Sequence, residues 1–189
     1  MKKIILIAAT MFLALAANAQ NLSFGYVNFN ELIMLMPEMD SAREQLTAAQ
    51  KEADETFGSM YEEYQTKAQQ YQQKAATWSA SIKESKEVEL QQIQQRIQQF
   101  QQDIQSELEE LQNKLQTPIV QKAQETVANI AKGKNLSFVF DQTSLIYIDK
   151  AQGYDITPDA RVALNIPEGR TLETLQAELQ AKAQAAAQQ

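Results

Sequence analysis

The chain has 189 residues, with 17 lysines and arginines against 24 aspartates and glutamates, and its formal net charge is −7. We expect no nucleic-acid partner, because an acidic chain repels the phosphate backbone. It contains neither cysteine nor histidine, which excludes disulfides, thiol nucleophiles, Cys/His metal sites and the commonest general base. With no phosphate-binding loop motif either, we predict no cofactor, no metal site and no enzymatic activity.

Residues 1–19 have the layout of a secretory signal peptide. Lys2 and Lys3 precede an apolar stretch over residues 4–16, and a small-x-small cleavage site follows at residues 17–19. The apolar stretch is shorter than the roughly 20 residues that a bilayer-spanning helix needs. We therefore predict export, cleavage after Ala19 and no stable membrane insertion.

Residues 20–34 open a predicted β-rich body. Leu22, Phe24 and Tyr26 alternate with smaller or polar residues across residues 22–29, which is typical of a strand. From about residue 35 the pattern changes to the helical period.

Two apolar stripes follow, each with steps of three or four residues. The first runs from Leu35 to Ile82 and the second from Leu90 to Ile119. Serines between them favour a turn near residues 79–83. We predict a long antiparallel helical hairpin over residues 35–132, with arms about 70 Å long at 1.5 Å per residue. Each arm has one apolar stripe, so much of its surface stays in water.

The outer part of the first stripe carries large adaptable side chains that could bind another polypeptide: Met60, Tyr64, Tyr71, Trp78 and Ile82. The alternative is that they simply pack the hairpin, since they lie on its packing stripe. Charge also varies along the arms: residues 38–63 carry net −6, residues 103–125 net −3, and residues 64–98 net +2. The predicted hairpin is therefore acidic at its root and mildly basic at its tip.

Residues 133–166 complete the predicted body. Gly133 is placed to cap the second helix at its C-terminal end. Two strands are expected at residues 135–141 and 145–149. Thr157-Pro158 should start a short helix that runs to about residue 165. Three short strands and one helix make a small core, so we expect several subunits to share it. The candidate oligomerisation residues are Leu22, Phe24, Tyr26, Leu136, Phe138, Phe140, Ile146 and Ile148. Residues 167–189 are rich in Ala and Gln and should form a helix or a disordered tail.

The fold class predicted is thus mostly α-helical with a small β body, in which a helical-hairpin tentacle projects from a short-stranded oligomerisation body. This order resembles the Skp/OmpH family of periplasmic chaperones over residues 22–165. The matching pieces are Gly25-Tyr26-Val27-Asn28 before a helix, Val127-Ala128 late in the hairpin, the strand Leu136-Ser137-Phe138-Val139-Phe140-Asp141, and Asp155-Ile156-Thr157 before the last helix.

The resemblance implies a homotrimer in the periplasm whose three tentacles enclose a cavity. Unfolded outer-membrane β-barrel proteins would be held there without ATP. Two features depart from the family pattern. The chain is acidic, whereas proteobacterial members are typically basic, so lipopolysaccharide binding is not inferred. The segment after Pro167 has no family counterpart. The alternative function is a structural or scaffolding coiled coil of the cell envelope. An adaptor of an efflux or secretion system is disfavoured, because those proteins carry more β structure.

Overall fold

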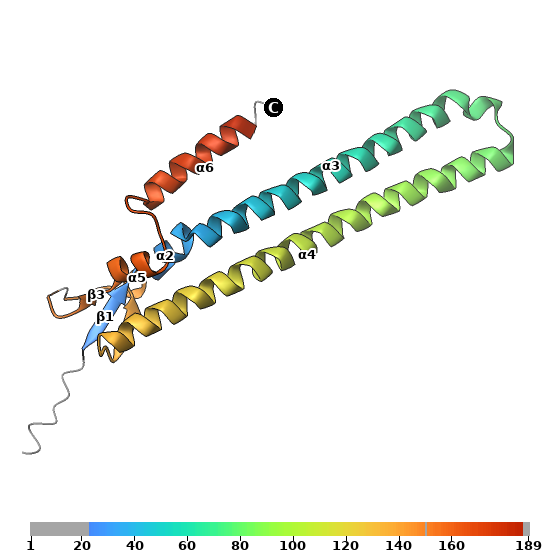
Figure 1. Ribbon diagram of the computed structural model, residues 1–189. Helices are drawn as coiled ribbons and strands as arrows, with labels where there is room; N and C mark the ends of the chain where they lie inside the picture. The colour runs from blue at the N-terminus through green and yellow to red at the C-terminus, as the bar shows by residue number, and fades with distance from the viewer. Residues whose placement is uncertain (1–22, 150, 187–189) are drawn as a thin grey trace, which may run out of the picture. The chain divides into compact units, whose positions relative to one another are not determined.

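The computed structural model describes residues 23–149 and 151–186 (Figure 1). The predicted leader over residues 1–19 and the candidate Leu22 lie outside these ranges. The fold class is confirmed: long helices accompany a small three-stranded sheet. The described residues divide into two compact units, one of residues 36–121 and one of residues 23–35 with 122–149 and 151–186. Within the described ranges, no helix combines the length and the apolar character that crossing a bilayer requires.

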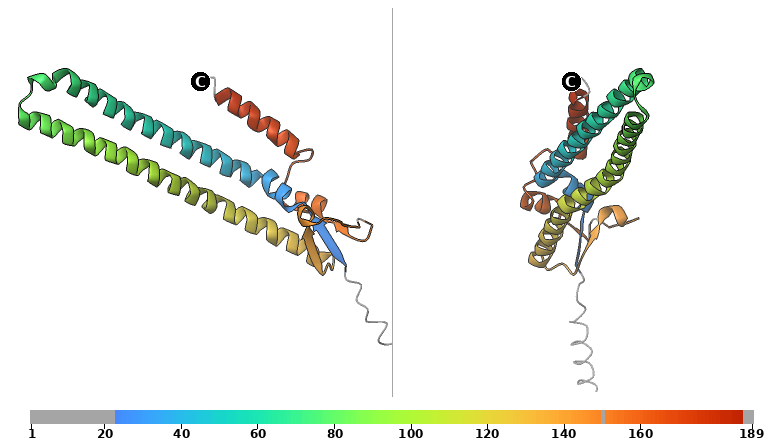
Figure 2. Two further views of the ribbon diagram at one scale, coloured as in Figure 1. Left: turned by 180° about the vertical axis from the view of Figure 1, so that it is seen from behind. Right: turned by 90° about the vertical axis from the view of Figure 1, so that its right-hand side faces the viewer.

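The first unit is a pair of antiparallel helices, α3 (Pro37–Lys74) and the larger part of α4 (Ala80–Gly133). They lie side by side in both views of Figure 2. Met36 is extended, with φ −61° and ψ 139°, because a residue before proline avoids the α conformation. Helical structure therefore stops at Met36 and restarts at Pro37, where proline at the first position loses no helical hydrogen bond.

The chain reverses direction slightly before the predicted turn at residues 79–83. α3 ends at Lys74, a 3-10 turn η1 (Ala75–Thr77) follows, and α4 begins at Ala80. The Ser79 hydroxyl accepts a hydrogen bond from the Ile82 amide at 3.4 Å. That serine caps the start of α4, a role that serine favours as much as a place in a turn.

The end of α4 corrects the prediction that Gly133 caps it. Gly133 is still helical, and Asn135 takes the left-handed conformation with φ 54°. The Leu136 amide donates to the Ala131 carbonyl at 2.9 Å, and the Asn135 amide donates to the Lys132 carbonyl at 3.1 Å. These two bonds form a Schellman motif, in which asparagine can replace the usual glycine.

The second unit contains the sheet, whose order is β2-β1-β3. The central strand β1 (Phe24–Val27) runs parallel to both β2 (Phe138–Asp141) and β3 (Tyr154–Asp155). β1 is shorter than the predicted strand over residues 22–29, because Asn28 starts a helix. Its side-chain oxygen accepts from the Glu31 amide, which caps the start of α2 (Phe29–Leu35), and its side-chain amide donates to the Glu31 carboxylate.

The strand predicted over residues 145–149 is wrong. The chain passes from β2 through a 3-10 turn η2 (Gln142–Ser144) into irregular structure, and the third strand comes later, at Tyr154–Asp155. Both edges of β1 are already paired, so a further strand has no free neighbour there. Ile146 and Tyr147 are accordingly exposed, despite their apolar pattern.

The helices α2, α5 (Thr157–Ala163) and α6 (Leu172–Ala186) bury the apolar core of this unit. The core side chains include Leu32, Leu35, Ile156, Leu164 and Leu175. Thr157 was expected to cap α5, but it is the first helical residue, and its hydroxyl accepts from the Asn28 amide. α6 realises the helical alternative for the C-terminal segment, and Leu175, only 2% exposed, anchors it. This core is larger than the sequence suggested.

Candidate functional site

One face of the sheet carries an aromatic cluster. The register pairs Phe24 with Phe138 and Tyr26 with Phe140, which places all four rings on one face because side chains alternate along strands. The Phe140 ring lies 6.2 Å from both the Phe24 and the Phe138 rings. Tyr26 is buried, whereas Phe138 and Phe140 remain 55% and 42% exposed. Two of the predicted oligomerisation residues thus present aromatic surface to solvent.

The segment between β2 and β3 adds to the exposed apolar surface of this unit. Ile146 is fully exposed, and Ile148 and Leu136 are half-buried. Tyr147 and Tyr154 are also exposed, and the sequence reasoning missed both. Tyr147 lies between Ile146 and Ile148, the two residues that the predicted strand over residues 145–149 singled out. No sequence pattern indicated Tyr154, which pairs with Gly25 in β3.

An open groove of about 440 Å³ lies beside β2 in the same unit. Its lining includes Val127, Ala128 and Ala131 from the end of α4 and Phe138, Val139 and Phe140 from β2. The groove brings the Val127-Ala128 pair of the family resemblance next to the β2 strand of that resemblance. The described surface of the body is therefore apolar along β2 as well as on the aromatic face.

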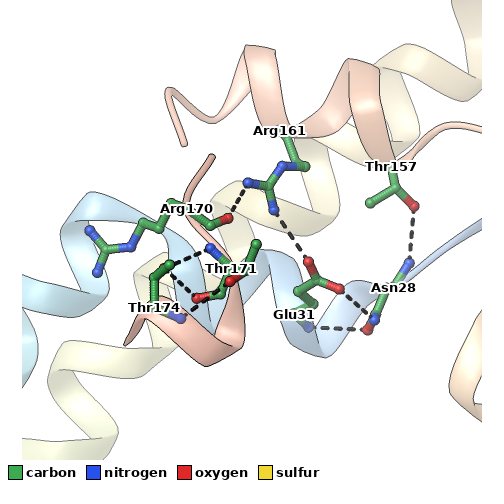
Figure 3. A network of polar contacts seen from close by, with 7 residues as sticks. All are labelled: Asn28, Glu31, Thr157, Arg161, Arg170, Thr171 and Thr174. Carbon is green, nitrogen blue, oxygen red and sulfur yellow. Dashed lines mark hydrogen bonds and ion pairs between the residues drawn. The ribbon is translucent and has the colours of Figure 1, made fainter. Parts of the chain in front are cut away.

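A polar network joins α2, α5 and the start of α6 (Figure 3). Arg161 of α5 donates to the Glu31 carboxylate of α2 at 3.3 Å and to the Arg170 carbonyl that precedes α6. Glu31 also accepts from the Asn28 side chain at 2.7 Å. Thr171 and Thr174 exchange backbone-to-hydroxyl hydrogen bonds, which cap α6. No sequence pattern indicated this network, because its members are separated by up to 130 residues.

The outer half of the hairpin unit is joined by polar contacts between α3 and α4. Lys67 pairs with Glu89, and Arg96 pairs with Glu63 at 3.0 Å. Lys86 also donates to Glu89, at 2.7 Å. The hydrogen bonds from Lys67 and Lys86 lower the pKa of Glu89 to about 2, and the bond to Glu89 raises the pKa of Lys67.

The predicted binding residues on α3 are partly engaged in these same contacts. The Tyr71 hydroxyl donates to Glu87, which raises the pKa of Tyr71, and the Tyr64 hydroxyl accepts from Gln94 at 3.0 Å. The Trp78 ring meets the Tyr71 ring edge-to-face at 5.9 Å. These three side chains are half-buried, as packing of the hairpin would require.

The remaining apolar side chains of the outer hairpin differ in exposure. Met60 is half-buried and Ile82 is exposed. Tyr61, stacked on Phe57 with a ring separation of 6.3 Å, and Val88 are also exposed, and the sequence reasoning missed them. Tyr61 lies one residue off the stripe, so the periodicity that located its neighbours excluded it.

The inner half of the hairpin unit contains an open groove of about 390 Å³ between α3 and α4. On α3 it is lined by small side chains, Ala49 and Ala53, and on α4 by large ones, Phe100, Ile104 and Leu108. Glu52 and Glu107 also line the groove. Apolar surface in this unit is thus accessible both on the outer half of the hairpin and within the groove.

Together, the long two-helix hairpin with accessible apolar side chains and the small sheet with an exposed aromatic face are the surfaces by which this chain can bind other polypeptides. A family model described as outer membrane protein (OmpH-like) matches residues 23–164, and the chain belongs to this family. The match supports a chaperone role and a place in the periplasm. It ends before α6, so that helix lies outside the family's common region.

Comparison with solved structures finds the same fold in a crystal structure from Caulobacter crescentus CB15, assigned as an OmpH-like outer membrane chaperone. The two chains share 15% identity with a TM-score of 0.68, and the similarity covers 76% of this chain and 83% of that one. A search of curated protein sequences finds no match.

Proposed function

We propose that this protein is an ATP-independent holdase of the periplasm, which binds unfolded outer-membrane β-barrel proteins between the helical hairpins of a homotrimer and prevents their aggregation. It acts without enzymatic chemistry. The observation that carries the proposal is the family match across residues 23–164, which includes the whole hairpin and the sheet.

The surface chemistry of the hairpin supports this role. A holdase needs many weak apolar contacts that it can release without an energy source, and half-exposed side chains on a wet helix offer these. Tyr61, Ile82 and Val88 are exposed in the outer half of the hairpin, and Met60 and Trp78 are half-buried there. Each such side chain can bury part of its surface against a client, at about 25 cal/mol per Å².

The surface chemistry of the body supports self-association. Phe138, Phe140, Ile146, Tyr147 and Tyr154 are all exposed within one small unit. Large apolar side chains that gather at the surface of one small unit favour an interface, because leaving them in water is unfavourable. A second and third copy of the same unit would cover these side chains, and closed symmetric oligomers are the usual outcome.

Aggregation of an unfolded client tests the holdase activity. A β-barrel protein unfolded in urea is diluted into buffer with the mature chain, and light scattering is followed. We expect scattering to fall to near baseline at a trimer excess. Unchanged scattering would refute the holdase proposal and favour the structural coiled-coil alternative, which copurification with one constant partner would then support.

Native mass spectrometry tests the homotrimer. We expect a mass three times that of the mature chain, and Ile146→Asp should shift the distribution towards monomers by placing a charge in the proposed interface. Val162→Asp is the matched control, since Val162 is also exposed but lies on α5. A folded wild-type monomer at micromolar concentration would overturn this part of the proposal.

A further inference from the structure

The groove in the inner half of the hairpin unit is open because the two helices present side chains of unequal size. Ala49 and Ala53 of α3 face the space that Phe100, Ile104 and Leu108 of α4 line from the other side. A methyl side chain cannot fill that space, so the large side chains on α4 lack part of the contact that close packing provides. An apolar side chain from another molecule would restore it.

The surroundings of the groove are strongly acidic. The segments 49–56 and 100–111 together contain seven carboxylates and one lysine, Lys51, which pairs with Glu55 on its own helix. Two of the carboxylates, Glu52 and Glu107, line the groove itself. The outer half of the hairpin differs, because its carboxylates Glu63 and Glu89 already pair with cations across the helices. An occupant with positive charge would therefore be favoured at the groove.

We propose that the groove between Ala49/Ala53 and Phe100/Ile104/Leu108 is a client-binding subsite, which takes a large apolar side chain from an unfolded segment that carries lysine or arginine on either side. The inference rests on the proposed holdase function and specifies where and what it binds. The apolar floor supplies the contact with the side chain, and the carboxylates supply attraction for the flanking cations. The predicted candidates in the outer half of the hairpin then form a second, less charged contact zone.

Two labelled peptides and two leucine variants test this assignment in the full mature chain. The probe is a fluorescein-labelled unstructured peptide with a central Phe-Leu pair and two lysines on each side, and its partner has glutamates in place of the lysines. Ala49→Leu fills the groove, while Ala48→Leu adds the same side chain at an exposed position one residue away. Leucine is nearly as good a helix former as alanine, so both variants should remain helical, which circular dichroism checks.

Fluorescence anisotropy should show that the lysine peptide binds the wild-type chain at least about tenfold more tightly than the glutamate peptide at low salt, with the difference shrinking as salt rises. Ala49→Leu should weaken binding of the lysine peptide about tenfold, and Ala48→Leu should leave it within about twofold. Glu52→Gln with Glu107→Gln should weaken it without filling the groove.

Equal binding by the Ala49→Leu and Ala48→Leu variants would overturn the subsite, as would equal binding of the two peptides. If the wild-type chain still suppresses aggregation of the β-barrel client in that case, the holdase proposal survives and the subsite alone fails. If Ala49→Leu instead changes the native mass, the groove is an interface between copies, and the assignment is also overturned.

Discussion

Arg161 is the side chain that links three helices of the body, and its removal should loosen α6 in particular. Its guanidinium donates to Glu31 at 3.3 Å and to the Arg170 carbonyl just before α6, and the two charged side chains are 21% and 25% exposed. A hydrogen bond to a charged group contributes about 1.5–3 kcal/mol. With a discount for partial solvent exposure, Arg161→Ala should cost about 2 kcal/mol.

Hydrogen exchange followed by mass spectrometry measures the loss of stability in α6 directly. A cost of about 2 kcal/mol corresponds to roughly 30-fold faster exchange of the protected amides of α6, because 1.4 kcal/mol is a factor of ten. Lys134→Ala is the matched control: Lys134 pairs with Asp159 at 2.9 Å in the same unit, but both side chains are more than 40% exposed. That pair should contribute at most about 0.5 kcal/mol. Similar α6 exchange in the two variants would refute the linking role of Arg161.

Three further predictions concern local conformation and charge. Asn135→Gly should raise the free energy of unfolding by about 0.5–1 kcal/mol in chemical denaturation, because only glycine adopts φ 54° without strain. Asn135→Ala should lower it by about 1 kcal/mol. The reverse order of stability would contradict the Schellman assignment. Gly25→Ala should lower the melting temperature at a cost of about 1–3 kcal/mol, since its Cβ would lie 2.7 Å from Leu136 and 3.3 Å from the Tyr154 carbonyl. The pKa of Glu89 is lowered from 4.5 to about 2, so its stabilising contribution should be complete above pH 4.5 and be lost as the pH falls towards 2. Glu89→Gln should remove this part of the acid sensitivity, which acid unfolding followed by circular dichroism measures. Unchanged acid unfolding would argue against the Lys67–Glu89 pair.

The helical period predicted the two long helices because it depends on side-chain spacing alone. The stripe residues Met39, Ala42, Ala53, Ile93 and Ile119 are all buried, as the spacing required. The periodicity did not determine where each helix begins and ends, because residues at helix ends are compatible with more than one local structure. Ser79 could either occupy a turn or cap a helix, and the sequence around it does not distinguish the two.

Contacts between residues far apart in the sequence, such as the pairing of strands, could not be predicted from the sequence. Residues 145–149 alternate like a strand, but a strand also needs a partner, and β1 pairs on its second edge with Tyr154–Asp155 instead. The contact from Arg161 to Glu31 likewise depends on the fold that brings α5 to α2. The candidate binding residues on the stripe were found because they share the helical period, whereas the groove between Ala49 and Phe100 depends on which small side chain faces which large one.

The parallel sheet also determines when the body can be assembled. β1 is made first, but it pairs with β2 and β3, and the register joins Phe24 to Phe138 and Gly25 to Tyr154. Closing a flexible loop of more than 100 residues costs about 4 kcal/mol, so these pairings must follow the local folding of the helices. A chain that stops before residue 138 can form α3 and most of α4 but leaves β1 without either neighbour. The sheet can therefore be completed only in molecules that extend through Asp155, and shorter chains leave β1 without its partners.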